Sequence, residues 1–216
     1  MNADEPARPQ PPPEHGFTPI DQHLFEARVV FVSGEVNAEL AVRVNRQLLA
    51  LEKVDPTRPI MLWIDSPGGE MFSGYAIYDT ARFVQPRVIT LVAGFAASMA
   101  SVIALAAEKA DRLAFPNAKL LIHQPLIQGV MHGRASELEI HAADIIATKK
   151  RLHRLYAERT GAPVERFEAL MERDHWLGPT AAQELGLISK VVETRAQLDA
   201  LLKTHHPGGS GSTRQT

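Results

Sequence analysis

Apolar segments rich in β-branched residues recur along the chain at intervals of about thirty residues. They begin near residues 28, 60, 88 and 118, and segments 35–52 and 73–83 between them carry apolar residues at helical spacing. This interval is the length of a right-handed strand–helix crossover, in which consecutive strands run parallel. The pattern therefore predicts an α/β fold with a mainly parallel sheet. Further strands are expected over 110–115 and 188–192.

The second half of the chain is expected to be mostly helical. A long charged segment, 136–159, has an apolar stripe at helical spacing, and Gly161 follows it as a helix-ending signal. The helix is too long to lie wholly on the face of one domain, which favours a projecting helix that packs against a partner. An ordinary surface helix is the alternative. Shorter helices are expected over 164–173 and 180–185.

The stretch from residue 88 to residue 107 combines two kinds of element. It starts as a continuous apolar run, which is typical of a strand buried on both faces, and becomes an Ala/Leu-rich helix from about Val102. Ser98 lies at the junction between the two. It could be a plain N-cap of the helix, or a reactive group beside amides that favour negative charge.

Topology predicts that three distant segments meet. The carboxyl ends of parallel strands share one edge of a sheet, and Gly68-Gly69, Ser98 and His123 all follow such ends. A serine, a histidine and a glycine turn whose amides approach closely are parts of a serine hydrolase site. A carboxylate must orient the histidine, and residue type alone leaves four candidates: Asp65, Asp79, Asp144 and Asp174.

Composition narrows the protein class. The 216 residues are 45% hydrophobic and carry a net charge of −2, which suits one globular domain and no nucleic-acid partner. Cysteine is absent, which excludes a thiol nucleophile and disulfides. We also expect no metal and no cofactor. We expect a cytoplasmic protein without a membrane span. A Pro-rich arm is expected over 1–17, a single domain over 18–203 and a flexible tail over 204–216.

Four motifs resemble the proteolytic subunit of the Clp protease, the ClpP family, over about residues 28–192. They occur in the family's order and spacing: Ser66-Pro67-Gly68-Gly69, Gly94-Phe95-Ala96-Ala97-Ser98-Met99-Ala100, Ile122-His123-Gln124-Pro125 and Glu172-Arg173-Asp174-His175-Trp176. The resemblance implies a ClpP/crotonase-like spiral of ββα units, with 136–159 as a projecting "handle" helix. It also implies a serine endopeptidase that hydrolyses unfolded polypeptides inside a closed chamber.

The resemblance also assigns residue roles. Ser98 matches the nucleophile, His123 the general base and Asp174 the carboxylate that orients it. The amides of Gly69 and Met99 match the oxyanion hole. Substrate backbone would pair with Gly68 and with the segment that begins at Pro125 and Leu126 and continues to Gly133. Glu172 and Arg173 resemble an ion pair between rings.

The implied partners are unfolded polypeptides, an AAA+ unfoldase and further subunits. Heptameric rings stacked as a tetradecamer are expected, either of this chain alone or with a paralogue. Trp63 matches an aromatic residue of the unfoldase-docking pocket but could equally be a core residue. Two alternatives remain: a ring subunit that is inactive without a paralogue, and a crotonase-type acyl-CoA enzyme, against which the Ser–His–Asp set argues.

The sequence departs from the family at several positions. Phe95 stands where a glutamine is usual and Ala100 where a glycine is usual, and both keep the surroundings of Ser98 small or apolar. The segment between His123 and the long helix is about two residues longer than expected. The polar arm at 1–17 stands where the family usually has an apolar N-terminal stretch that contacts the unfoldase. The sequence therefore does not predict docking to a standard unfoldase.

Overall fold

The computed structural model describes residues 18–126 and 134–203. Seven strands form one sheet in the order β1-β2-β3-β4-β7, and β5 extends it by pairing with the end of β3 and with β6. All pairs are parallel except β5–β6, which confirms the predicted mainly parallel α/β fold. The strands are β1 (Val29–Val36), β2 (Ile60–Gly69), β3 (Val88–Ala97), β4 (Arg112–Ala114), β5 (Lys119–Ile122), β6 (His175–Leu177) and β7 (Lys190–Val191).

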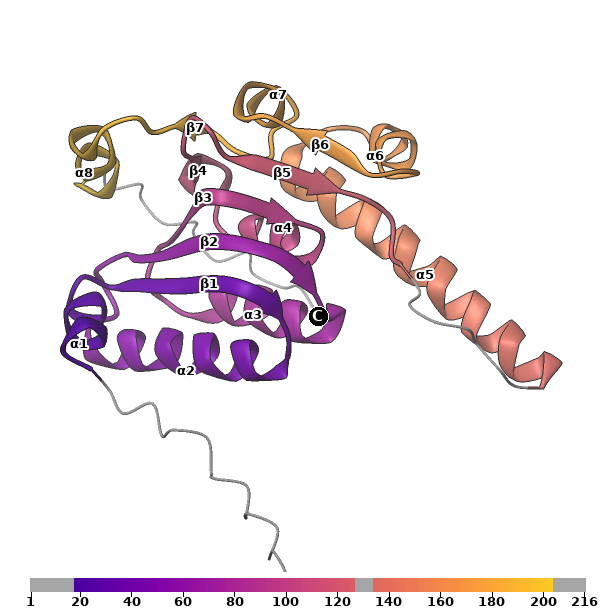
Figure 1. Cartoon of the computed structure of the whole chain (residues 1–216), viewed down its shortest axis with the longest axis horizontal. Coiled ribbons are helices and arrows are strands. Elements are labelled where there is room, and N and C mark those ends of the chain that lie inside the picture. The colour runs from indigo at the N-terminus through magenta and orange to yellow at the C-terminus, as the bar shows by residue number, and fades with distance from the viewer. Residues whose placement is uncertain (1–17, 127–133, 204–216) are drawn as a thin grey trace, which may run out of the picture.

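Helices cover both faces of the sheet (Figure 1). One face, with Val32, Leu62 and Val92, packs against α2, α3 and α4. The opposite face, with Met61 and Leu91, packs against α8. The helices are α1 (Pro19–Glu26), α2 (Ala38–Val54), α3 (Met71–Phe83), α4 (Met99–Ala104), the 3₁₀ turn η1 (Lys109–Asp111), α5 (Ala135–Thr160), α6 (Val164–Leu170), α7 (Pro179–Glu184) and α8 (Arg195–Lys203).

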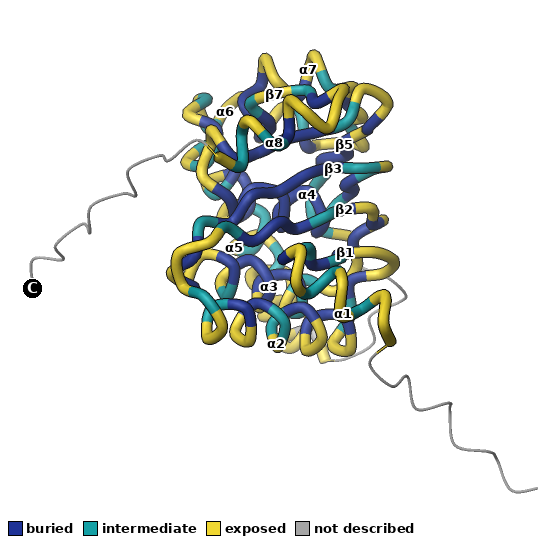
Figure 2. Tube along the Cα trace, turned by 90° about the vertical axis from the view of Figure 1, so that its left-hand side faces the viewer, coloured by how far each residue is buried: buried dark blue, intermediate teal, exposed yellow. Residues whose placement is uncertain are grey.

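The central strand β3 is buried on both faces, as its continuous apolar run predicts. Residues Val88 to Val92 are all buried, and in Figure 2 the strands at the centre of the sheet form the dark-blue interior. Thr90 is the polar exception, and its hydroxyl donates to the main-chain oxygen of Ala104 at 2.8 Å. The buried hydroxyl of Thr90 is therefore paired, as buried polar groups generally are.

Several element boundaries differ from the predicted ones. The second strand extends through Gly69, because Gly68 and Gly69 continue the ladder with the end of β1. The helix predicted from residue 35 begins at Ala38, because the side chain of Asn37 accepts the amide of Leu40 as an N-cap. The helix predicted from Val102 already begins at Met99. Helix α8 was not predicted at all.

The long helix α5 projects from the body of the protein, as predicted (Figure 1). Its 26 residues span about 39 Å. Its C-terminal part is anchored, with Leu152 and Tyr156 buried, and Gly161 ends it in the left-handed region at φ 82°. Nearer its N-terminus, Ile140 and Ile146 are exposed, so described residues of this chain leave that part of the apolar stripe uncovered.

Three expectations lie outside the described residues: the arm at 1–17, the tail at 204–216 and the substrate-pairing segment at 127–133. Within 18–126 and 134–203, no helix has the combination of length and hydropathy needed to cross a bilayer.

Candidate active site

Ser98 adopts a strained backbone conformation between β3 and α4. Its φ is 53° and its ψ is −122°, a combination that L-residues with a Cβ rarely adopt. Such a conformation costs about 1–3 kcal/mol and persists only where surrounding contacts enforce it. Within the described chain, the Ser98 side chain makes no capping hydrogen bond to α4. The plain N-cap interpretation is therefore wrong, and the hydroxyl is left available for another role.

Main-chain hydrogen bonds hold the Ser98 backbone on both sides. Its amide donates to the oxygen of Leu121 on β5, and its own oxygen accepts from the amide of Ser101, both at 3.0 Å. Gly68 crosses close beneath this turn: a Cβ there would lie 2.5 Å from the oxygen of Ala97 and 2.8 Å from the Met99 amide nitrogen. Only glycine permits this approach, and the φ of Gly68 is also positive, at 85°.

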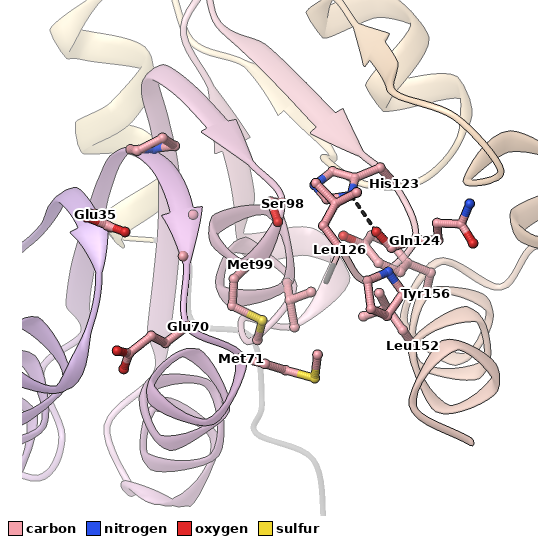
Figure 3. A pocket seen from close by; sticks show the side chains of 15 residues that line it. Glu35, Glu70, Met71, Ser98, Met99, His123, Gln124, Leu126, Leu152 and Tyr156 are labelled. Carbon is pink, nitrogen blue, oxygen red and sulfur yellow. Dashed lines mark hydrogen bonds between the residues drawn. The ribbon is translucent and has the colours of Figure 1, made fainter. Parts of the chain in front are cut away.

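A cleft of about 570 Å³ opens at this edge of the sheet. It brings together all the sequence-predicted site residues except Asp174: Gly68, Gly69, Ser98, Met99, His123, Pro125 and Leu126. Figure 3 shows Ser98 after β3 and His123 after β5 flanking this cleft, with Leu152 and Tyr156 reaching it from α5. The strand ends thus converge as the parallel topology predicts.

The orientation of His123 is set by its neighbour. Nδ1 of the half-buried ring lies 2.5 Å from the main-chain oxygen of Gln124 (Figure 3). A carbonyl oxygen only accepts, so Nδ1 carries the proton and, in the neutral ring, Nε2 is the unprotonated nitrogen. A histidine in this tautomer can accept a proton through Nε2.

Asp174 is exposed, is not among the cleft-lining residues, and makes no hydrogen bond to His123 in the described structure. The antiparallel ladder pairs Ile122 with His175, so one further step would place His123 opposite Asp174. The chain leaves that register at Gln124, whose amide donates to the oxygen of Met171 at 2.8 Å. The role of Asp174 stays a prediction.

The neighbouring acid Glu172 has a partner within this chain. Its carboxylate accepts from Lys149 of α5 at 2.7 Å. This hydrogen bond is the main reason that the pKa of Glu172 lies below its ordinary value. The ion pair therefore ties the segment before Asp174 to the anchored part of α5.

The contribution of α5 to the cleft was not predicted from the sequence. Leu152 and Tyr156 are four residues apart, so they occupy one helical face, and together with Met71, Met99 and Val102 they make the cleft wall apolar. The helical spacing was visible in the sequence, but the side of the domain that this face meets was not. An apolar wall beside Ser98 suits a nonpolar substrate side chain.

A mainly parallel α/β sheet thus carries a strained serine, a histidine protonated on Nδ1 and a close-packed glycine pair at one strand-end cleft, an arrangement typical of acyl-transfer sites. A model of the Clp protease family matches residues 14–195. The chain therefore belongs to the Clp protease family, a family of ClpP-type serine peptidases.

Proposed function

We propose that this chain is the serine endopeptidase subunit of a self-compartmentalised Clp-type protease that hydrolyses unfolded polypeptides. The observation that carries the proposal is Ser98 itself, a serine held in a strained turn, without a capping role, in a cleft shared with His123. Family membership supplies the reaction class. The apolar cleft wall and the glycine pair at the end of β2 supply room for an extended peptide.

The proposed reaction is a two-step acyl transfer. The Ser98 oxygen attacks the peptide carbonyl as Nε2 of His123 takes its proton, and the amides of Gly69 and Met99 donate to the resulting oxyanion. The carbon–nitrogen bond then breaks, and His123 returns the proton to the leaving amine. Water next attacks the acyl-enzyme, giving its proton to His123, and the ester bond breaks to regenerate the Ser98 hydroxyl.

Asp174 is the proposed partner of the histidine during turnover. The Gln124 carbonyl fixes the correct tautomer but carries no net charge, so it stabilises an imidazolium less than a carboxylate does. The proposal therefore requires Nδ1 to exchange the Gln124 oxygen for the Asp174 carboxylate. The antiparallel register of β5 and β6 supports this, because its continuation by one residue would place His123 opposite Asp174.

Labelling with a fluorophosphonate tests the proposal, because the reagent needs an activated serine. We expect the full chain to be labelled at Ser98, Ser98→Ala to lose the label, and Ser189→Ala, which alters a serine beyond the cleft, to keep it. Asp174→Asn should lower peptide turnover by about 10⁴-fold. Absence of labelling in the unaltered chain would refute the serine peptidase proposal. Wild-type turnover in Asp174→Asn would leave Gln124 as the sole orienting group.

Assembly into heptameric rings and a tetradecamer is part of the proposal. Its support in this chain is the exposed apolar stripe of α5, where Ile140 is 68% exposed and Ile146 is 54% exposed. A stripe of this kind on a projecting helix is typical of a surface that packs against another helix. Particle mass of the purified protein, alone and mixed with a paralogue, separates homomeric rings from mixed ones.

An AAA+ unfoldase is the proposed delivery partner, and the cytoplasm the expected compartment. Trp63 is half-buried, with its ring centroid 5.9 Å from that of Phe31 and 5.2 Å from that of Phe115. Its remaining exposure leaves an aromatic surface that an apolar loop could contact. Trp63→Ala should abolish unfoldase-dependent degradation of a folded substrate while peptide hydrolysis continues. Equal loss of unfoldase-dependent degradation and peptide hydrolysis would indicate that Trp63 is a core residue and not a docking residue.

A further inference from the structure

A tyrosine from α5 reaches the helix that follows Ser98. The Tyr156 hydroxyl lies 2.6 Å from the Ser101 hydroxyl, and both residues are 1% exposed. The tyrosine ring stacks on Phe167 of α6, with centroids 5.4 Å apart, which fixes its position. Burial raises the pKa of Tyr156 above its ordinary value, so its hydroxyl stays protonated and can donate.

The Ser101 hydroxyl also contacts two main-chain oxygens. It lies 2.6 Å from the oxygen of Ser98 and 3.1 Å from that of Leu121. Carbonyl oxygens only accept, and a serine hydroxyl has one proton, so that proton is directed at the carbonyls. The Tyr156 hydroxyl must then be the donor to Ser101. The direction of the chain is therefore Tyr156 to Ser101 to the Ser98 oxygen, an order in which each bond polarises the next.

The Ser98 oxygen belongs to the peptide group that also contains the Met99 amide. A peptide group is planar, and in the trans form its oxygen and its N–H point in opposite directions. Whatever fixes the Ser98 oxygen toward the interior therefore fixes the Met99 N–H toward the cleft. Two donors from one residue, the amide and the hydroxyl of Ser101, hold that oxygen.

We propose that Ser101 and Tyr156 are positioning residues that hold the Ser98–Met99 peptide, and with it the Ser98 hydroxyl and the Met99 oxyanion donor, in the geometry that acylation needs. The inference rests on the proposed function and adds to it two buried hydroxyls that touch no substrate. It explains why the unfavourable Ser98 φ of 53° is maintained. It also gives a role to the buried hydroxyl of Tyr156, a residue that lines the cleft.

The test compares three variants with the unaltered full chain: Tyr156→Phe, Ser101→Ala and the double variant. Thr90→Val is the matched control, because it removes another buried hydroxyl that donates to a main-chain oxygen, away from the cleft. Fluorophosphonate acylation is measured over a range of reagent concentrations, which separates maximal rate from affinity. Circular dichroism confirms that each variant is folded.

Ser101→Ala should lower the maximal acylation rate about 10- to 100-fold, since small displacements of reacting groups have effects of that size. Tyr156→Phe, which keeps the Ser101 hydroxyl, should lower it about 3- to 10-fold. Reagent affinity should change little, and Thr90→Val should react at the wild-type rate. The double variant should be no slower than Ser101→Ala alone, because Tyr156 acts through Ser101.

Wild-type acylation rates in both single variants would overturn the inference while the proposed function stands. An equal loss of rate in Thr90→Val would reduce the effect to general destabilisation and also overturn it. Should Ser101→Ala fail to fold, Tyr156→Phe, which removes one oxygen atom, decides the matter alone. No acylation of the unaltered chain would refute the proposed function, and this inference with it.

Discussion

Adding one methyl group at Gly68 should damage the proposed site more than the fold. The new Cβ would lie 2.5 Å from the Ala97 oxygen and 2.8 Å from both the Met99 nitrogen and the Ser98 Cβ. These neighbours are backbone or directly attached to it, so they cannot rotate away. The positive φ of 85° adds about 1–2 kcal/mol and the overpacking about 1–3 kcal/mol. Gly68→Ala should therefore lower the free energy of unfolding by about 2–5 kcal/mol.

The activity loss in Gly68→Ala should exceed what this destabilisation explains. The crowded atoms include the Met99 amide, and removal of one oxyanion donor lowers turnover about 10²- to 10³-fold. Gly161→Ala is the matched control, because Gly161 has nearly the same φ, 82°, with nothing within 4 Å of the added Cβ. That variant should lose about 1–2 kcal/mol and no activity.

Urea unfolding and fluorophosphonate labelling of the two glycine variants measure these effects separately. In conditions where both variants are folded, we expect Gly68→Ala to be unreactive and Gly161→Ala to be labelled at the wild-type rate. Labelling of folded Gly68→Ala at the wild-type rate would refute the assignment of the Met99 amide as an oxyanion donor. Equal destabilisation of the two variants would contradict the steric argument.

Three further predictions concern the fold and the assembly. Arg112→Met should lower the free energy of unfolding by about 2–5 kcal/mol in urea titrations, because the buried guanidinium donates to the main-chain oxygens of Ala107 and Arg159. Burial lowers the pKa of His153, so the unfolded chain binds that proton more tightly and stability falls as the pH drops through the ordinary value of 6.5. His153→Leu should flatten this fall in thermal melts from about pH 8 to about pH 5, and an unchanged slope would contradict it. Ile146→Asp should reduce particle mass in sedimentation without altering far-UV circular dichroism, and an unchanged mass would argue against packing through α5.

The fold could be predicted because each strand–helix unit has a recognisable local pattern of apolar and polar residues. Burial on both faces makes β3 a continuous apolar run, and the thirty-residue interval fixes parallel connections. Helix α8 was missed although Leu198, Leu201 and Leu202 have the spacing of an amphipathic helix, and these leucines pack on the sheet face opposite α2, α3 and α4. The strand character of Gly68 and Gly69 was missed because two glycines signal a turn unless a neighbouring strand, here β1, pairs with them.

Of the site, the sequence predicts only those residues whose positions follow from the carboxyl ends of the strands. Gly68, Ser98 and His123 share a cleft because parallel strands deliver their carboxyl ends to one edge. Tyr156 could not be predicted in the same way, because the direction in which α5 crosses the domain depends on tertiary packing against α6. The hydrogen bond of His123 to the adjacent Gln124 depends on side-chain rotation, which residue spacing does not encode.

The two interpretations of Ser98 differ in geometry rather than in sequence. A serine N-cap has an extended backbone, and its side-chain oxygen accepts a hydrogen bond from a main-chain amide of the first helical turn. Ser98 has neither feature: its φ is positive, and within the described residues its side chain caps nothing. Ser101 stabilises the start of α4 instead, because its amide and its hydroxyl both donate hydrogen bonds to the main-chain oxygen of Ser98. Within the described residues, the Ser98 hydroxyl therefore has no capping role and lies at a cleft that it shares with a base, His123, as a serine nucleophile requires.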